Sequence, residues 1–209
     1  EKPNLLYVLD KSGSMNNNNK WANAKAGVVN NAKTYENRIR FGLETFSTNA
    51  SIDAGIPSSS ATISTALNKI TPLGDTYMVR AMNTARAHLE KVLKADTIKG
   101  RPTTIVFITD GSPSDRCPVS EVTALRKLSI NGTLVDVKTY VIGFGVNVNP
   151  TCLNSLATAG GTALSGTIKY YFATNQSSIS TVIGQIANTA SQEICNGLDD
   201  DCDGKVDNL

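Results

Sequence analysis

Three nearly continuous apolar runs limit what this chain can fold into. They read LLYVL at 5–9, TTIVFIT at 103–109 and VKTYVIGFG at 137–145. A strand that is covered by helices on both faces has no polar face, so its sequence loses the alternation of apolar and polar residues. We therefore interpret these runs as central strands of a parallel sheet.

Strand-like and helix-like segments alternate along the chain. Strands are predicted at 5–9, 40–46, 104–109, 137–144 and 169–172, and helical spacing occurs at 21–35, 63–70, 78–93, 119–128, 153–159 and 179–190. This alternation predicts an α/β fold, with a doubly wound, mostly parallel sheet and helices on both faces. The half-polar segment ASIDAGIP, at 50–57, is predicted to be an edge strand that forms a hairpin with the strand before it.

The carboxyl ends of the central strands are the expected place for a site, because the strand order of such a sheet reverses there. Asp10 ends the first apolar run, and Asp110 follows TTIVFIT. We expect these two carboxylates to converge from neighbouring strand tips.

Ser12 and Ser14 follow Asp10 in the sequence DKSGS. Serine and aspartate often cap helices, and a predicted helix follows, so capping is one interpretation of this segment. A nucleophilic serine would need a base, but the only histidine, His88, lies in the helical run ARAHLEKV and is interpreted as exposed. A phosphoaspartyl transferase would need a second aspartate two residues after Asp10, where the sequence has Ser12. Both catalytic interpretations are therefore disfavoured.

Thr76 adds a third hydroxyl from a distant segment, LGDT at 73–76, which precedes the helix predicted at 78–93. Two carboxylates and three hydroxyls form an all-oxygen set, which suits a hard divalent cation such as Mg²⁺. Few negative charges would surround the cation, so it would remain electrophilic toward an acidic ligand from outside.

The order of DKSGS, GDT and TDG resembles the von Willebrand factor type A (VWA) domain with its metal-ion-dependent adhesion site, over about residues 3–191. The resemblance implies a Rossmann-like fold with six strands, one of them a short antiparallel edge strand. It implies that Ser12 and Ser14 bind Mg²⁺ or Mn²⁺ directly and that Thr76 binds it directly or through water. Asp10 and Asp110 would hold the metal mostly through water while they accept hydrogen bonds from the hydroxyls. A carboxylate from a partner would fill the open coordination position.

A run of four asparagines follows this motif and departs from the family pattern. Asn16, Asn17, Asn18 and Asn19 form either a flexible loop or a ligand rim that offers amide groups to a partner.

The four cysteines are widely spaced, which favours disulfides and an oxidising compartment over buried reduced thiols. Cys117 and Cys152 each follow a predicted neighbouring strand, so their loops leave the same end of the sheet and a disulfide between them is geometrically reasonable. Crossed pairing with Cys195 and Cys202 is the alternative.

The acidic C-terminal segment reads EICNGLDDDCDGKVDNL and resembles a CNGxDDDCDG-type metal-binding motif of secreted bacterial proteins. Its spacing is that of an EF-hand-type calcium loop, with Lys205 at the position that supplies a backbone carbonyl. The bidentate glutamate of a full loop would fall at position 210, so either Glu193 takes its place or the site is incomplete. A solvated acidic tail is the alternative. The predicted Ca²⁺ ligands are Asp199, Asp201, Asp203, Lys205 and Asp207, and Cys195 and Cys202 would close a ring around them.

Length and charge indicate the domain organisation and disfavour some classes of function. The 209 residues suit a VWA domain at 1–191 and an acidic calcium-binding motif at 192–209. Residues 193–209 have a charge of −5, so the rest of a chain with a net charge of +2 carries +7. That positive charge is dispersed, which disfavours nucleic-acid binding, and no apolar run is long enough for a transmembrane segment.

These observations favour a secreted or cell-surface, bacterial, non-enzymatic adhesion module. It would bind a protein or surface ligand that presents a carboxylate. A structural scaffold domain of a larger secreted assembly and a metal-assisted hydrolase or phosphoryl transferase are the alternatives.

Overall fold

A six-stranded sheet forms the centre of the computed structural model, which describes residues 1–191. The strand order is β3-β2-β1-β4-β7-β8, and only β3 runs antiparallel to its neighbour. The order reverses between β1 and β4, as a doubly wound sheet requires. The strands are β1 (Asn4–Asp10), β2 (Arg40–Phe46), β3 (Ala50–Ser58), β4 (Thr103–Thr109), β7 (Lys138–Phe144) and β8 (Tyr171–Ala173).

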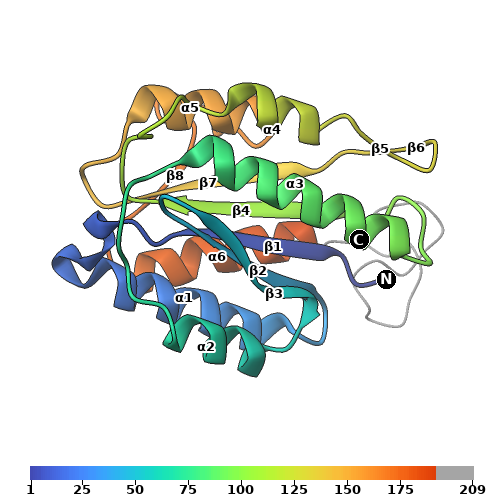
Figure 1. The fold of residues 1–209 in the computed structure, drawn as a ribbon, viewed down its shortest axis with the longest axis horizontal. Coiled ribbons are helices and arrows are strands. Elements are labelled where there is room, and N and C mark those ends of the chain that lie inside the picture. The colour runs from blue at the N-terminus through green and yellow to red at the C-terminus, as the bar shows by residue number, and fades with distance from the viewer. Residues whose placement is uncertain (192–209) are drawn as a thin grey trace.

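Helices cover both faces of the sheet. In Figure 1, α3, α4 and α5 lie above it, and α1, α2 and α6 lie below it. They are α1 (Lys20–Tyr35), α2 (Ser60–Asn68), α3 (Met78–Ala95), α4 (Val119–Leu125), α5 (Pro150–Ala159) and α6 (Gln176–Ala190). The predicted fold class is confirmed, including the antiparallel edge strand β3.

Strand β1 shows why the apolar runs are continuous. Leu6 and Val8 belong to the core cluster beneath α3, α4 and α5, whereas Leu5, Tyr7 and Leu9 belong to the cluster that packs against α1, α2 and α6. Both sets are fully buried, so neither face of β1 tolerates a run of polar residues.

The structure corrects the region around 128. The predicted helix at 119–128 ends at Leu125, and a hairpin of β5 (Leu128–Ile130) and β6 (Thr133–Val135) follows. Asn131 and Gly132 both have positive φ, at 51° and 83°, which is the backbone of a two-residue turn that suits hairpins. An Asn-Gly pair is a hairpin signal that outweighs the helical spacing of the residues before it.

Smaller differences occur at element ends. The last strand begins at Tyr171 rather than at 169, and a 3-10 segment, η1 (Gly13–Asn19), separates β1 from α1. Within residues 1–191, no helix combines the length and the apolar character needed to cross a membrane.

Candidate metal centre

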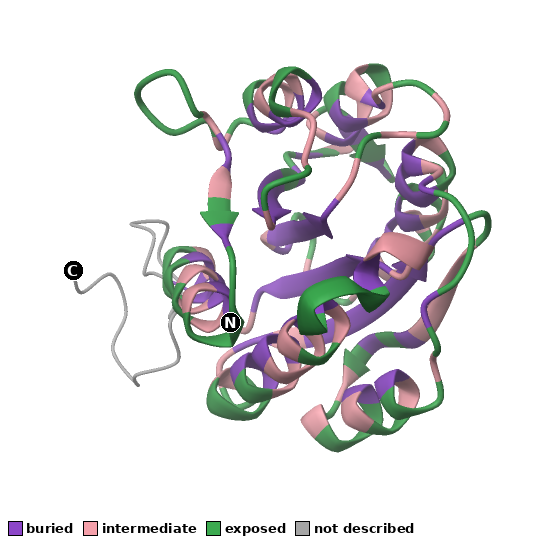
Figure 2. Cartoon of the chain, turned by 90° about the vertical axis from the view of Figure 1, so that its left-hand side faces the viewer, coloured by how far each residue is buried: buried purple, intermediate pink, exposed green. Residues whose placement is uncertain are grey.

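Three loops meet at the edge where the parallel strands end. This edge is at the left of Figure 1 and faces the viewer in Figure 2, where buried strand residues run up to a border of more exposed loops. Gly13 N–H donates to the carbonyl of Gly74 at 2.9 Å, and Leu73 N–H donates to the carbonyl of Lys11 at 2.8 Å. These bonds fix the loop that follows β1 against the loop that precedes α3.

Asp10 is fully buried at the tip of β1, and neutral donors satisfy both of its oxygens. Its Oδ1 accepts the Ser12 N–H at 2.7 Å, and its Oδ2 accepts the Thr109 hydroxyl at 2.6 Å. Burial raises the pKa of the Asp10 carboxyl to about 6, although these hydrogen bonds act in the opposite direction.

Asp110 lies one residue beyond β4 and is also fully buried. Its Oδ1 accepts the Ser14 hydroxyl at 2.6 Å, and the hydroxyl oxygens of Ser12 and Ser14 are 3.1 Å apart. The two serines therefore face the carboxylates. Ser12 makes no side-chain capping bond, and α1 begins only after Asn19, so the helix-capping interpretation is wrong.

Thr76 completes the predicted group. It is buried, and a Cβ placed on Gly111 would lie 3.6 Å from Thr76 Oγ1 and 3.9 Å from Ser14 Oγ. The hydroxyls of Thr76 and Ser14 thus both lie close to the open side of Gly111. Ser114 holds Thr76 by paired bonds, since Thr76 N–H donates to Ser114 Oγ and Ser114 N–H donates to the Thr76 carbonyl.

The chemistry of this donor set fits a hard divalent cation. All five side chains present oxygen, and only two of them carry charge. No group of three or more His, Cys, Asp or Glu side chains in residues 1–191 is arranged to hold a metal. A cation at this edge would therefore depend on the hydroxyls of Ser12, Ser14 and Thr76 as much as on the carboxylates.

The only histidine contacts a different part of the molecule. His88 on α3 is half-buried rather than exposed as expected, and its Nε2 accepts the Ile56 N–H of β3 at 3.4 Å. Its pKa is lowered, mainly by burial. It therefore packs against the edge strand, where it has no serine hydroxyl as a partner.

Lys20 is the residue that sequence reasoning missed. It is the first residue of α1, it is buried, and its Nζ lies 2.5 Å from Asp110 Oδ2. The one available signal was a lysine ten residues after Asp10, but lysines at helix starts are ordinarily solvated.

The asparagine run belongs to the 3-10 segment η1, and all four side chains are exposed. Asn16 Nδ2 donates to the Pro72 carbonyl at 2.9 Å, which adds a further bond between the two loops. Asn18 and Asn19 both adopt left-handed backbone conformations, with φ of 53° and 58°. Asparagine tolerates this conformation better than most residues do, so the composition of the run suits its shape.

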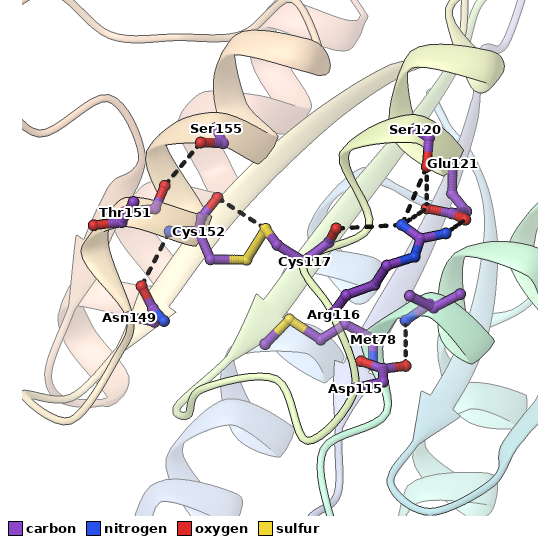
Figure 3. Close-up of a disulfide and its surroundings, with 11 residues drawn as sticks. Met78, Asp115, Arg116, Cys117, Ser120, Glu121, Asn149, Thr151, Cys152 and Ser155 are labelled. Atoms are coloured by element: carbon purple, nitrogen blue, oxygen red, sulfur yellow. Dashed lines mark hydrogen bonds and ion pairs between the residues drawn. A yellow bond between two sulfur atoms is a disulfide. The ribbon is translucent and has the colours of Figure 1, made fainter.

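A disulfide joins Cys117 to Cys152, as the parallel-neighbour argument predicted, and the crossed pairing is wrong (Figure 3). Their Cα atoms are 5.6 Å apart. In the same loop as Cys117, the Asp115 carboxylate accepts the N–H groups of Met78 and Val79 at the start of α3. The loop after β4 is thus bound both to α5 and to α3.

The predicted calcium ligands and the second cysteine pair, Cys195 and Cys202, lie outside the described residues.

Comparison with known proteins agrees with the fold. A chain described as von Willebrand factor type A from Catenulispora acidiphila superimposes with a TM-score of 0.76 at 14% identity, over 93% of this chain and 44% of that one. Proximal thread matrix protein 1 from the mussel byssus, in a form with a zinc-occupied adhesion motif, gives 0.67 at 22%, over 90% and 46%. Manganese-loaded TRAP from Plasmodium vivax gives 0.67 at 17%, over 90% and 74%.

The chain spans less than half the length of the mussel and Catenulispora proteins. At these identities the likeness establishes the fold alone. The family model for the von Willebrand factor type A domain matches residues 5–112. Because that match covers more than half of the sequence, the chain belongs to the von Willebrand factor type A domain family.

Proposed function

We propose that this chain is a non-enzymatic protein-binding module that works outside the cell. It holds Mg²⁺ or Mn²⁺ at the carboxyl edge of its sheet and presents the ion to a carboxylate of a partner. The observation that carries the proposal is the convergence of five oxygen-bearing side chains from three loops: Asp10, Ser12, Ser14, Thr76 and Asp110.

The hydrogen bonds support a division of labour among these side chains. Both oxygens of each carboxylate already have protein partners, so the aspartates suit contact with the metal through water. The hydroxyl oxygens of Ser12, Ser14 and Thr76 have lone pairs left for direct coordination. When bound, the cation would supply an electrophilic position for an anionic group.

The surface around the centre suits a protein partner. Asn16, Asn17, Asn18 and Asn19 expose amide groups beside the motif, as a ligand rim would. Leu73, in the loop that is bonded to Lys11, is 76% exposed, and Val146, two residues beyond β7, is 81% exposed. An acidic side chain that is flanked by apolar contacts would match this combination.

The proposal also covers the cellular location of the protein and its acidic C-terminal segment. A disulfide in residues 1–191 and a relative from the mussel byssus support a secreted or cell-surface protein, which we place in a bacterium. Residues 192–209 would form a separate calcium-binding motif after the VWA domain at 1–191, with Ca²⁺ held by Asp199, Asp201, Asp203, Lys205 and Asp207 and with Glu193 as a further ligand.

Metal titration tests the centre itself. Mg²⁺ and Mn²⁺ are titrated calorimetrically into metal-free wild type, into Asp10→Asn, and into Asp75→Asn as the matched control. Asp75 is an exposed carboxylate next to Thr76, so its loss removes the same charge from the same edge. We expect Asp10→Asn to lose one binding event that wild type and Asp75→Asn retain. Equal binding by all three proteins would refute the assignment.

Partner capture tests the function. The immobilised proteins are incubated with native cell-surface extract in Mg²⁺, and bound proteins are released with EDTA and identified. Proteins retained by wild type and Asp75→Asn, absent from Asp10→Asn and released by EDTA would support adhesion. Retention that is indifferent to both EDTA and Asp10→Asn would favour the scaffold alternative, and metal-dependent phosphoester turnover lost in Asp10→Asn would favour the hydrolase.

A further inference from the structure

Lys20 forms a buried ion pair inside the proposed metal centre. Its side chain is 7% exposed, that of Asp110 is fully buried, and the Nζ–Oδ2 distance is 2.5 Å. The environments of the two carboxylates therefore differ: Asp110 has a charged partner, whereas the two oxygens of Asp10 accept hydrogen bonds from the neutral donors Ser12 and Thr109. One of the two carboxylates of the centre already has a cation that belongs to the protein.

The surrounding backbone leaves room for this lysine. Gly145, just beyond the end of β7, has a φ of +90°, and a Cβ placed on it would lie 3.2 Å from Lys20 Cε and 3.8 Å from Nζ. Asn18 and Asn19, which both have left-handed backbone conformations, immediately precede Lys20, the first residue of α1. A side chain at position 145 would therefore crowd the Lys20 side chain, whose ammonium group reaches Asp110.

We propose that Lys20 is a tethered counter-charge that lowers the affinity of the centre for its divalent cation and keeps the metal-free loops folded. This proposal rests on the proposed function. With Lys20, the centre offers a divalent ion a net charge of −1 from its three ionised groups instead of −2. The ammonium and the metal repel each other across a poorly hydrated site, where charges interact more strongly than in water.

The same charge has a second consequence for binding. A divalent ion held by a centre of net charge −1 leaves the assembled site positive, so an incoming anionic group is attracted more strongly. The ammonium cannot diffuse away, so Asp110 keeps a cationic partner while the metal is absent. Without either cation, Asp110 would be a buried carboxylate whose only side-chain partner in the described part of the chain is the Ser14 hydroxyl, which is an unfavourable state.

A lysine of the same loop provides the matched control. Lys11 lies next to Asp10 in sequence, but its Nζ donates to Ser51 Oγ at 3.4 Å on the edge strand β3. Lys11→Met therefore removes the same charge from the domain without touching Asp110. Lys20→Met keeps the length of the side chain and removes the ammonium.

Calorimetric titration of Mg²⁺ into the metal-free full chain measures the effect. The Asp10→Asn variant identifies which heat belongs to this centre rather than to residues 192–209. We expect Lys20→Met to bind Mg²⁺ at the centre about tenfold more tightly than wild type, or tighter still, and Lys11→Met to bind within about twofold of wild type. The melting temperature of Lys20→Met should fall in EDTA and should rise on Mg²⁺ addition by more than that of wild type.

The outcomes separate this inference from the proposed function. If wild type binds Mg²⁺ at the centre and Lys20→Met binds with the same affinity, Lys20 is a structural ion pair only and the inference is overturned. If wild type binds neither Mg²⁺ nor Mn²⁺ there, both proposals are overturned. If Lys20→Met folds only when Mg²⁺ is present, the metal has replaced the ammonium, which supports the inference. If it folds under neither condition, Lys20→Gln, which keeps a donor without the charge, is measured against the same expectations.

Discussion

Glu44 on β2 gives the sharpest test of the energetics of this fold. Its side chain is fully buried, and neither carboxyl oxygen has a hydrogen-bond partner among residues 1–191. It is paired in register with Val8 on one side and Ile52 on the other. Burial raises the pKa of Glu44 well above its usual range, and the charge of Asp53 raises it further. The folded protein therefore keeps a proton on Glu44 at a pH where the unfolded chain has lost it.

The sign of the pH dependence follows from that difference in proton binding. An unfolded glutamate loses its proton near pH 4.5, so above that pH the folded state binds one more proton than the unfolded state. The free energy of unfolding then falls by about 1.4 kcal/mol for each pH unit until the folded-state pKa is reached. Glu44→Gln should remove this slope. Glu44→Met should also remove the unpartnered polar group and raise stability by about 1–3 kcal/mol.

Urea denaturation in EDTA at pH 5, 6, 7 and 8 measures this effect without a contribution from bound metal. The difference in unfolding free energy between Glu44→Gln and wild type should grow with pH in favour of the variant. Glu90→Gln on the surface of α3 is the matched control, and its difference from wild type should stay within about 0.5 kcal/mol at every pH. A Glu44→Gln difference that is constant from pH 5 to pH 8 would refute the reasoning.

Four further variants test packing and the centre, each by urea denaturation. Replacing Cys117 and Cys152 by alanine opens a link between residues 35 positions apart and should cost about 4 kcal/mol, and an unchanged midpoint would count against the bridge. Thr109→Val removes a hydroxyl donor from a buried carboxylate and should cost about 1–3 kcal/mol in EDTA; no loss would mean that the bond contributes nothing. Gly143→Ala places a methyl group 2.6 Å from a tyrosine ring and should cost about 1–3 kcal/mol, whereas Gly184→Ala on α6 has space and should be neutral or stabilising; equal effects would contradict this packing.

The sequence predicted the sheet well because its strongest pattern is set by burial on two faces. Three continuous apolar runs can be satisfied only where helices cover both sides of each strand, and this placed Asp10 and Asp110 at neighbouring tips. The hairpin formed by β5 and β6 was missed because its strands are three residues each, too short to show an alternation.

The convergence of the five oxygen-bearing side chains was also predictable, since strand tips and the loop before α3 must meet at one edge. The burial of Lys20 and of Glu44 was not predictable. A lysine at the start of a helix is normally solvated. Only the folded structure, in which Lys20 contacts Asp110 and lies beside Gly145 just beyond β7, shows that its side chain is buried. Glu44 lies in RFGLETF, where nothing local distinguishes a buried glutamate from an exposed one on an edge strand.

The loop that carries Asp110 is fastened at several points along its length. Ser114 is bonded to Thr76, Asp115 holds the start of α3, and Cys117 is bridged to Cys152. A recognition loop that is ordered before its partner arrives loses little conformational freedom on binding, so more of the contact energy appears as affinity. Under the proposed function, reducing the bridge should therefore weaken capture of a partner chiefly through faster dissociation, even though no cysteine lies among the proposed metal ligands.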